Sequence, residues 1–119
     1  MLRLIPFMLF GALVACGGDS SSGSGVDSSK KLVELDATQR QQLCEYMVEA
    51  EGGVAASKMC GDGITITVKS ATDCVTGLSG LSASCSATVD SAETCAEAAG
   101  DDLCNLIRSS SCSFLLQCQ

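Results

Sequence analysis

The cysteines are the residues of this chain with the most evident chemistry. The sequence contains nine of them in 119 residues. One is Cys16, and the other eight are spread over the rest of the chain: Cys44, Cys60, Cys74, Cys85, Cys95, Cys104, Cys112 and Cys118. An even number of cysteines in a small exported chain predicts a disulfide framework, here of four bridges. No pair has the C-x-x-C spacing and there is no histidine, which argues against zinc or iron–sulfur ligation.

The pairing of these eight cysteines is open, with one restriction. Cys112 and Cys118 are predicted to lie on one helix, where six residues correspond to about 9 Å of rise. That separation exceeds the usual Cα distance across a disulfide. We therefore expect each of them to pair with a cysteine elsewhere in the chain.

No set of residues predicts catalysis. Without histidine, the Ser-His-Asp and Cys-His arrangements are excluded. Asp101 and Asp102 are interpreted as the start of a helix, where carboxylates interact favourably with the macrodipole. Glu45 and Glu49 are one helical turn apart and are expected on a solvated face. Cys60-Gly61-Asp62-Gly63 lacks the further ligands of a calcium or phosphate loop and predicts a tight turn. We expect no enzyme, no cofactor and no metal.

The start of the chain is typical of an export signal. Residues 1–3 carry one positive charge, and residues 4–14 form an apolar run too short to span a bilayer. Leu13-Val14-Ala15-Cys16 then resembles the lipobox of bacterial lipoproteins. The resemblance implies cleavage after residues 1–15, a diacylglyceryl thioether on Cys16, and acylation of the new amino terminus. The alternatives are a plain secretory signal with an incidental cysteine, or an uncleaved apolar helix.

This resemblance also implies a location. Acyl chains on Cys16 would anchor the protein to a membrane of the bacterial cell envelope. Gly17, rather than Asp, follows the cysteine, which by similarity to Gram-negative sorting patterns favours the outer membrane, on its periplasmic or its surface face.

Two regions follow the expected signal peptide. Residues 16–31 comprise the lipidated cysteine and a Gly/Ser-rich stretch, which predicts a flexible tether with an r.m.s. span of roughly 20 Å. Residues 32–119 have helical periodicity and predict a single disulfide-rich helical domain.

Helix starts are visible at three positions. Asp36 precedes Gln39 with the spacing of a capping box, and Ser70 and Thr88 begin similar patterns. In the third helix, Glu93 is predicted to face water. Shorter helices are expected over residues 101–107 and 111–118, and residues 64–68 alternate as an extended connector or one edge of a hairpin.

The fold class predicted is mainly α. We expect a small bundle of four or five short helices, with at most one short extended segment, after a cleaved signal and a flexible linker. Nearly every helix has a cysteine on or beside its apolar stripe, so the disulfides are expected to join helices through the core.

Charge and aromatic content exclude some partners. Loss of Arg3 with the signal would leave six basic residues against 14 acidic ones, a net charge of about −8. Such a surface repels nucleic acid and anionic lipid headgroups. Tyr46 and Phe114 would be the remaining aromatic residues, so a stacking platform for bases or sugars is not expected.

Several short motifs resemble those of small cysteine-rich lipoproteins of myxobacteria and their relatives. They are Leu43-Cys44-Glu45-Tyr46, Gly52-Gly53, Thr88-Val89, Glu93-Thr94-Cys95 and residues 112–118. The resemblance implies a lipobox, a polar tether and an eight-cysteine helical domain, and it supplies no activity. We expect a non-enzymatic cell-envelope lipoprotein with an envelope protein as partner, acting as an interaction or structural module. The alternative is a small binding module for a lipid-like or other apolar ligand.

Overall fold

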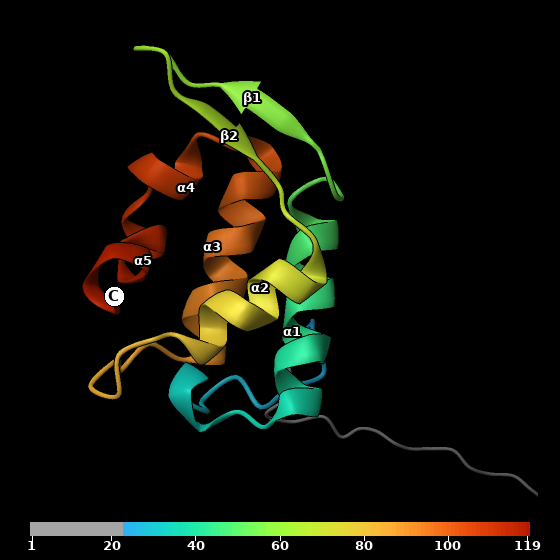
Figure 1. The fold of residues 1–119 in the computed structure, drawn as a ribbon, viewed down its shortest axis with the longest axis vertical. Helices are drawn as coiled ribbons and strands as arrows, with labels where there is room; N and C mark the ends of the chain where they lie inside the picture. The colour runs from blue at the N-terminus through green and yellow to red at the C-terminus, as the bar shows by residue number, and fades with distance from the viewer. Residues whose placement is uncertain (1–22) are drawn as a thin grey trace, which may run out of the picture.

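The computed structural model describes residues 23–119 as a mainly helical domain, which confirms the predicted fold class (Figure 1). The expected signal peptide, Cys16 and the first part of the expected tether lie outside these residues. The elements in chain order are η2 (Leu32–Glu34), α1 (Ala37–Ala50), β1 (Ser57–Met59), β2 (Thr65–Thr67), α2 (Ala71–Ser79), α3 (Val89–Asp101), α4 (Asn105–Arg108), η3 (Ser110–Cys112) and α5 (Phe114–Gln117). Among the described residues, no helix has the length and apolar character that crossing a bilayer requires.

Helix α1 begins at the predicted capping box. The Gln39 backbone N–H donates to Asp36 Oδ1 at 2.8 Å, and the Asp36 N–H donates to Gln39 Oε1 at 3.1 Å. Two otherwise unpaired amides at the helix start are thereby satisfied. The helix ends before Gly52 and Gly53, whose φ angles of +112° and +96° are ones that other residues rarely adopt.

Helix α3 packs beside α1 with the same direction (Figure 1). Its buried residues include the small side chains of Ala92, Ala96 and Ala99. A Cβ added at Gly100 would collide with the backbone oxygen of Ala50. The two helices are therefore close enough at this end that only glycine fits.

A β-hairpin connects α1 to α2. Ser57 pairs with Thr67 and Met59 with Thr65 in an antiparallel register. Of the two interpretations given for residues 64–68, the hairpin edge is confirmed. Val68 follows β2 and is buried against Ala99 and Leu103.

Four disulfides join the elements of the described domain. The pairs are Cys44–Cys74, Cys60–Cys104, Cys85–Cys118 and Cys95–Cys112. They connect α1 to α2, the hairpin to the turn before α4, the segment after α2 to the carboxyl end, and α3 to η3. Cys112 and Cys118 pair with other cysteines, as the helix geometry predicts.

The last two predicted helices have different boundaries in the structure. α3 continues to Asp101, so the helix predicted over residues 101–107 is reduced to α4. The segment predicted over 111–118 is divided at Ser113 into η3 and α5.

The tether prediction is wrong for residues 23–31, which lie against the domain. We call this segment the strap. Val26 is 3% exposed and belongs to the main hydrophobic core. The Val89 N–H donates to the Lys30 oxygen and the Leu32 N–H donates to the Ala87 oxygen, both at 2.9 Å. Composition alone predicts coil here, but these long-range contacts order the segment.

Glu93 does not face water as predicted. Its side chain is 4% exposed, and Oε2 accepts a hydrogen bond of 3.1 Å from the Ser24 backbone N–H. The strap covers this side of α3 and removes the carboxylate from solvent.

The domain should depend on its disulfides. The core has few large side chains, and four bridges at about 2–4 kcal/mol each are comparable to the net stability of an ordinary domain. We expect full reduction to melt most of the helical circular-dichroism signal near room temperature. Alkylation without reductant, followed by intact mass measurement, should show no free thiol among the eight domain cysteines. A cooperative thermal transition in the fully reduced protein would contradict the expectation.

Candidate functional site

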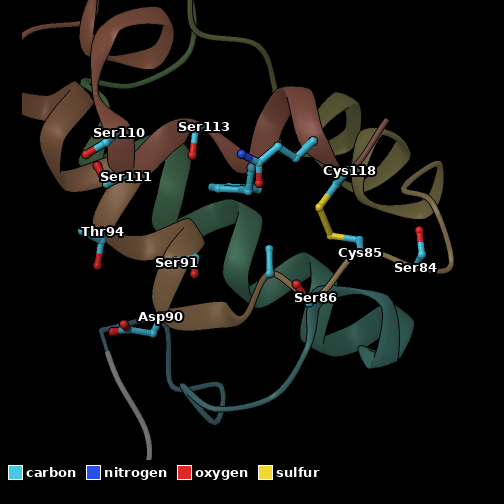
Figure 2. A pocket seen from close by; sticks show the side chains of 13 residues that line it. Ser84, Cys85, Ser86, Asp90, Ser91, Thr94, Ser110, Ser111, Ser113 and Cys118 are labelled. Atoms are coloured by element: carbon cyan, nitrogen blue, oxygen red, sulfur yellow. A yellow bond between two sulfur atoms is a disulfide. The ribbon is translucent and has the colours of Figure 1, made fainter.

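The described domain has a groove between α3 and the carboxyl-terminal segment (Figure 2). It encloses about 600 Å³. Its lining residues are Ser84, Cys85, Ser86, Ala87, Asp90, Ser91, Thr94, Ser110, Ser111, Ser113, Phe114, Gln117 and Cys118. Most of these side chains carry a hydroxyl group, so we call it the hydroxyl groove.

Two disulfides hold the walls of the hydroxyl groove together. Cys95–Cys112 joins the α3 wall to η3, and Cys85–Cys118 joins the segment before α3 to the carboxyl end. Phe114 lies beneath at 8% exposure and belongs to the core. Because both walls are covalently linked, the groove is preformed rather than assembled on binding.

The hydroxyls of the groove fall into two groups. Some are bonded within the protein: Ser109 and Ser111 oxygens are 2.7 Å apart, and the Ser91 oxygen is 3.3 Å from Thr88. A second group of polar side chains is exposed and makes no hydrogen bond to other residues of the described domain. It comprises the hydroxyls of Ser86, Thr94, Ser110 and Ser113 and the amide of Gln117. These groups can both donate and accept hydrogen bonds to a bound molecule.

Asp90 is the one residue with a charged side chain among those that line the groove. There is no paired carboxylate, no cation and no base beside a nucleophile among these lining residues. The chemistry that these side chains offer is hydrogen bonding to a neutral polar molecule or peptide segment.

The carboxylate pairs considered in the sequence lie outside the groove. Asp101 is the last residue of α3, whereas Asp102 accepts hydrogen bonds of 3.0 Å from the Cys104 N–H and from Lys58 Nζ. These bonds, the Cys104 amide first, lower the pKa of the Asp102 carboxyl below its usual value. The interpretation of Asp101 and Asp102 as a helix start is therefore wrong, because Asp102 is the C-cap of α3 and α4 begins only after Cys104.

Glu45 and Glu49 are exposed on α1, as the sequence predicts. Glu45 accepts a hydrogen bond of 2.8 Å from Gln41 one turn earlier. The Cys60–Gly63 sequence is the tip of the hairpin, where the Ile64 N–H donates to the Gly61 oxygen at 2.8 Å and Asp62 has φ +53°. The predicted tight turn is confirmed.

Two further groups were not singled out from the sequence. The Tyr46 hydroxyl on α1 donates to Glu97 Oε2 on α3 at 2.8 Å, which raises the pKa of Tyr46 to about 12. Glu51, at the carboxyl end of α1, is half-buried, and desolvation raises its pKa to about 7. Both effects arise from tertiary packing.

The hydroxyl groove was not predicted from the sequence either, although many of its residues belong to two serine-rich stretches. Serines recur over residues 82–86 and again over 109–113. The first cluster contains Cys85, and the second contains Cys112. Cys85 pairs with Cys118 and Cys112 pairs with Cys95, so both clusters are held at one groove by bridges whose pairing cannot be deduced from spacing.

Comparison of the chain with family models, with curated proteins and with solved structures gave no match.

The raised pKa of Glu51 gives a pH-dependent prediction. A carboxyl whose pKa is raised by folding favours the folded state below about pH 4.5, and this contribution is lost as pH rises to about 7. Replacement of the carboxylate also removes a negative charge from a helix carboxyl end. We expect Glu51→Gln to raise the free energy of unfolding at about pH 8 by about 1–3 kcal/mol, and at about pH 4 by much less.

Denaturant unfolding at the two pH values, with the disulfides intact, measures this effect. Glu49→Gln is the matched control, because Glu49 is exposed on the same helix. Equal stability of the parent protein and Glu51→Gln at the higher pH would contradict the assignment.

Proposed function

We propose that the protein is a lipid-anchored cell-envelope lipoprotein without enzymatic activity, whose domain acts as an interaction module. The observation that carries the proposal is the complete pairing of the domain cysteines. All eight form bridges with one another, which leaves Cys16 alone outside the framework. Cys16 is also the residue at the lipobox-like position.

The disulfides support export of the chain. Bridges of this number persist in the periplasm or outside the cell, where glutathione does not keep thiols reduced. A cysteine without a disulfide partner would have a reactive thiol in that environment, unless the thiol is modified in another way. A thioether to diacylglycerol is such a chemistry, and it agrees with the apolar run before Cys16.

The hydroxyl groove is the surface that we propose for the interaction. Its side chains Thr94, Ser110 and Ser113 offer hydrogen bonds from opposite walls, and the two walls do not need to be ordered on binding. Preorganisation lowers the entropic cost of association. The partner that suits it is an envelope protein segment with neutral polar side chains and free backbone groups.

A second candidate function is favoured by a smaller hollow between η2 and the end of α2. It encloses about 320 Å³ and is lined by the apolar residues Leu32, Val33, Leu78, Leu81 and Ala83 together with the polar Arg40 and Ser79. This volume is at the lower limit of ligand pockets. A small apolar ligand there would be detected by native mass measurement after gentle extraction.

Lipidation is tested by substitution of the anchor. We expect Cys16→Ser to abolish labelling by an alkyne fatty acid and to leave unprocessed precursor, because no thiol remains for the thioether. Ser22→Ala, a few residues later, is the control and should label normally. Undiminished labelling of Cys16→Ser would remove the anchor from the proposal.

The interaction surface is tested by site-specific photocrosslinking in the native envelope. A benzoylphenylalanine at Ser113, in the hydroxyl groove, should give a discrete adduct with an envelope protein. The control position is Thr72, which is exposed on α2 away from the groove. Adducts of the same pattern and yield at both positions would show that the groove is not the preferred surface.

A further inference from the structure

The strap occupies a defined position on the domain. Two of its carbonyl groups accept hydrogen bonds from the first turn of α3: Ser28 oxygen from the Asp90 N–H and Lys30 oxygen from the Val89 N–H, each at 2.9 Å. The first amides of a helix have no partner within it. The strap therefore supplies acceptors that α3 would otherwise obtain from water.

Side chains and backbone contacts fix the rest of the strap. Val26 is buried in the core, and Ser24 donates its N–H to the buried Glu93. Gly23 lies so close to the ring of Tyr46 that an added Cβ would be 2.6 Å from Cε1. Burial of a valine side chain contributes about 1.5–3 kcal/mol, which adds to the backbone hydrogen bonds in holding the segment on the domain.

Docking of the strap shortens the connection to Cys16. Six residues, 17–22, separate Cys16 from Gly23. Seven Cα–Cα steps span at most about 25 Å, whereas a free segment up to residue 32 would span up to about 55 Å. An anchor on Cys16 therefore keeps Gly23 within about 25 Å of the membrane surface.

The residues around Gly23 define which side of the domain is near that surface. They belong mainly to α1, and the hollow at this point is lined by Gly23, Ser24, Gln42, Glu45, Tyr46 and Glu49. Glu97 of α3 adjoins them through its bond to Tyr46. We call this the exit face.

The exit face is polar, and it lies on the side of α1 away from α2. Cys44 is linked to α2, and Tyr46, two residues later, points to nearly the opposite side of the helix. The exposed large hydrophobic side chains of the described residues are on other elements: Val54, Met59, Ile64, Ile107 and Leu116. Nothing on the exit face provides apolar side chains for insertion into a bilayer.

We infer that the strap holds the domain against the membrane with the exit face toward the lipid headgroups and α2 away from them. The inference rests on the proposed lipidation of Cys16. Its partner surface is a zwitterionic headgroup layer, which the polar face contacts without insertion. Exposed Glu45, Glu49 and Glu97 disfavour close approach to anionic headgroups, most strongly at low salt.

Energy transfer from a single tryptophan tests this orientation. The chain contains no tryptophan, so one substitution gives one donor. Glu45→Trp places the donor on the exit face and Thr72→Trp on α2, and both positions are exposed. In the full lipidated protein on zwitterionic vesicles with dansylated headgroups, we expect several-fold stronger transfer from Glu45→Trp. Equal transfer from the two positions would overturn the inference.

Two changes to the strap region make the test specific. A flexible Gly/Ser insertion between Ser22 and Gly23 leaves the strap intact and lengthens the connection, and it should abolish the difference between the two donors. Val26→Asp should also abolish the difference between the two donors, because a buried carboxylate would release the strap from the domain. Val26→Ile is the conservative control. A difference that persists with the insertion would show that the strap does not set the orientation.

The same samples distinguish a failure of the lipidation proposal from a failure of the orientation proposal. Fatty-acid labelling and vesicle flotation report whether Cys16 carries lipid, independently of the donor position. Absence of labelling refutes the anchor, whereas labelled protein with equal transfer refutes the orientation alone.

Discussion

The close packing of α3 against α1 is the interaction on which the rest of the structure depends. It is possible because α3 presents alanines and Gly100 where larger side chains would separate the helices. The strap binds at the first turn of α3, Cys95 links its middle to η3, and the segment after the hairpin covers its end through Val68. Each of these contacts requires α3 to be held in place by α1.

Small side chains in the core also explain the number of disulfides. Phe114 is the one aromatic residue among the buried residues of the described domain, and the largest fully buried side chains are Leu32 and Leu43. Such a core removes less apolar surface from water than one with several aromatic rings. The bridges offset this deficit by restricting the unfolded chain, and they join segments that are 17–44 residues apart in sequence.

Features that depend on neighbouring residues could be predicted from the sequence, whereas contacts between distant residues could not. The caps at Asp36, Ser70 and Thr88 depend on neighbours three residues away, and all three are present in the structure. The strap was mistaken for coil because its composition lacks apolar residues apart from Val26, and its carbonyls bond to α3 amides about 60 residues later. The prediction that Glu93 is exposed was wrong for the same reason. The hydroxyl groove depends on a disulfide pairing that the spacing of the cysteines does not determine.

The strap and the hydroxyl groove meet at one residue of α3. The Asp90 side chain lines the groove (Figure 2). Its backbone N–H donates to the Ser28 oxygen of the strap. Undocking the strap would leave the amides of Val89 and Asp90 without these acceptors and loosen the turn that forms part of the groove wall. The proposed anchor and the proposed interaction surface would therefore be mechanically connected, because a pull on the strap would act on the same helical turn that a ligand in the groove would contact. A ligand that orders this turn would, by the reciprocity of coupled equilibria, also tighten the strap on the domain.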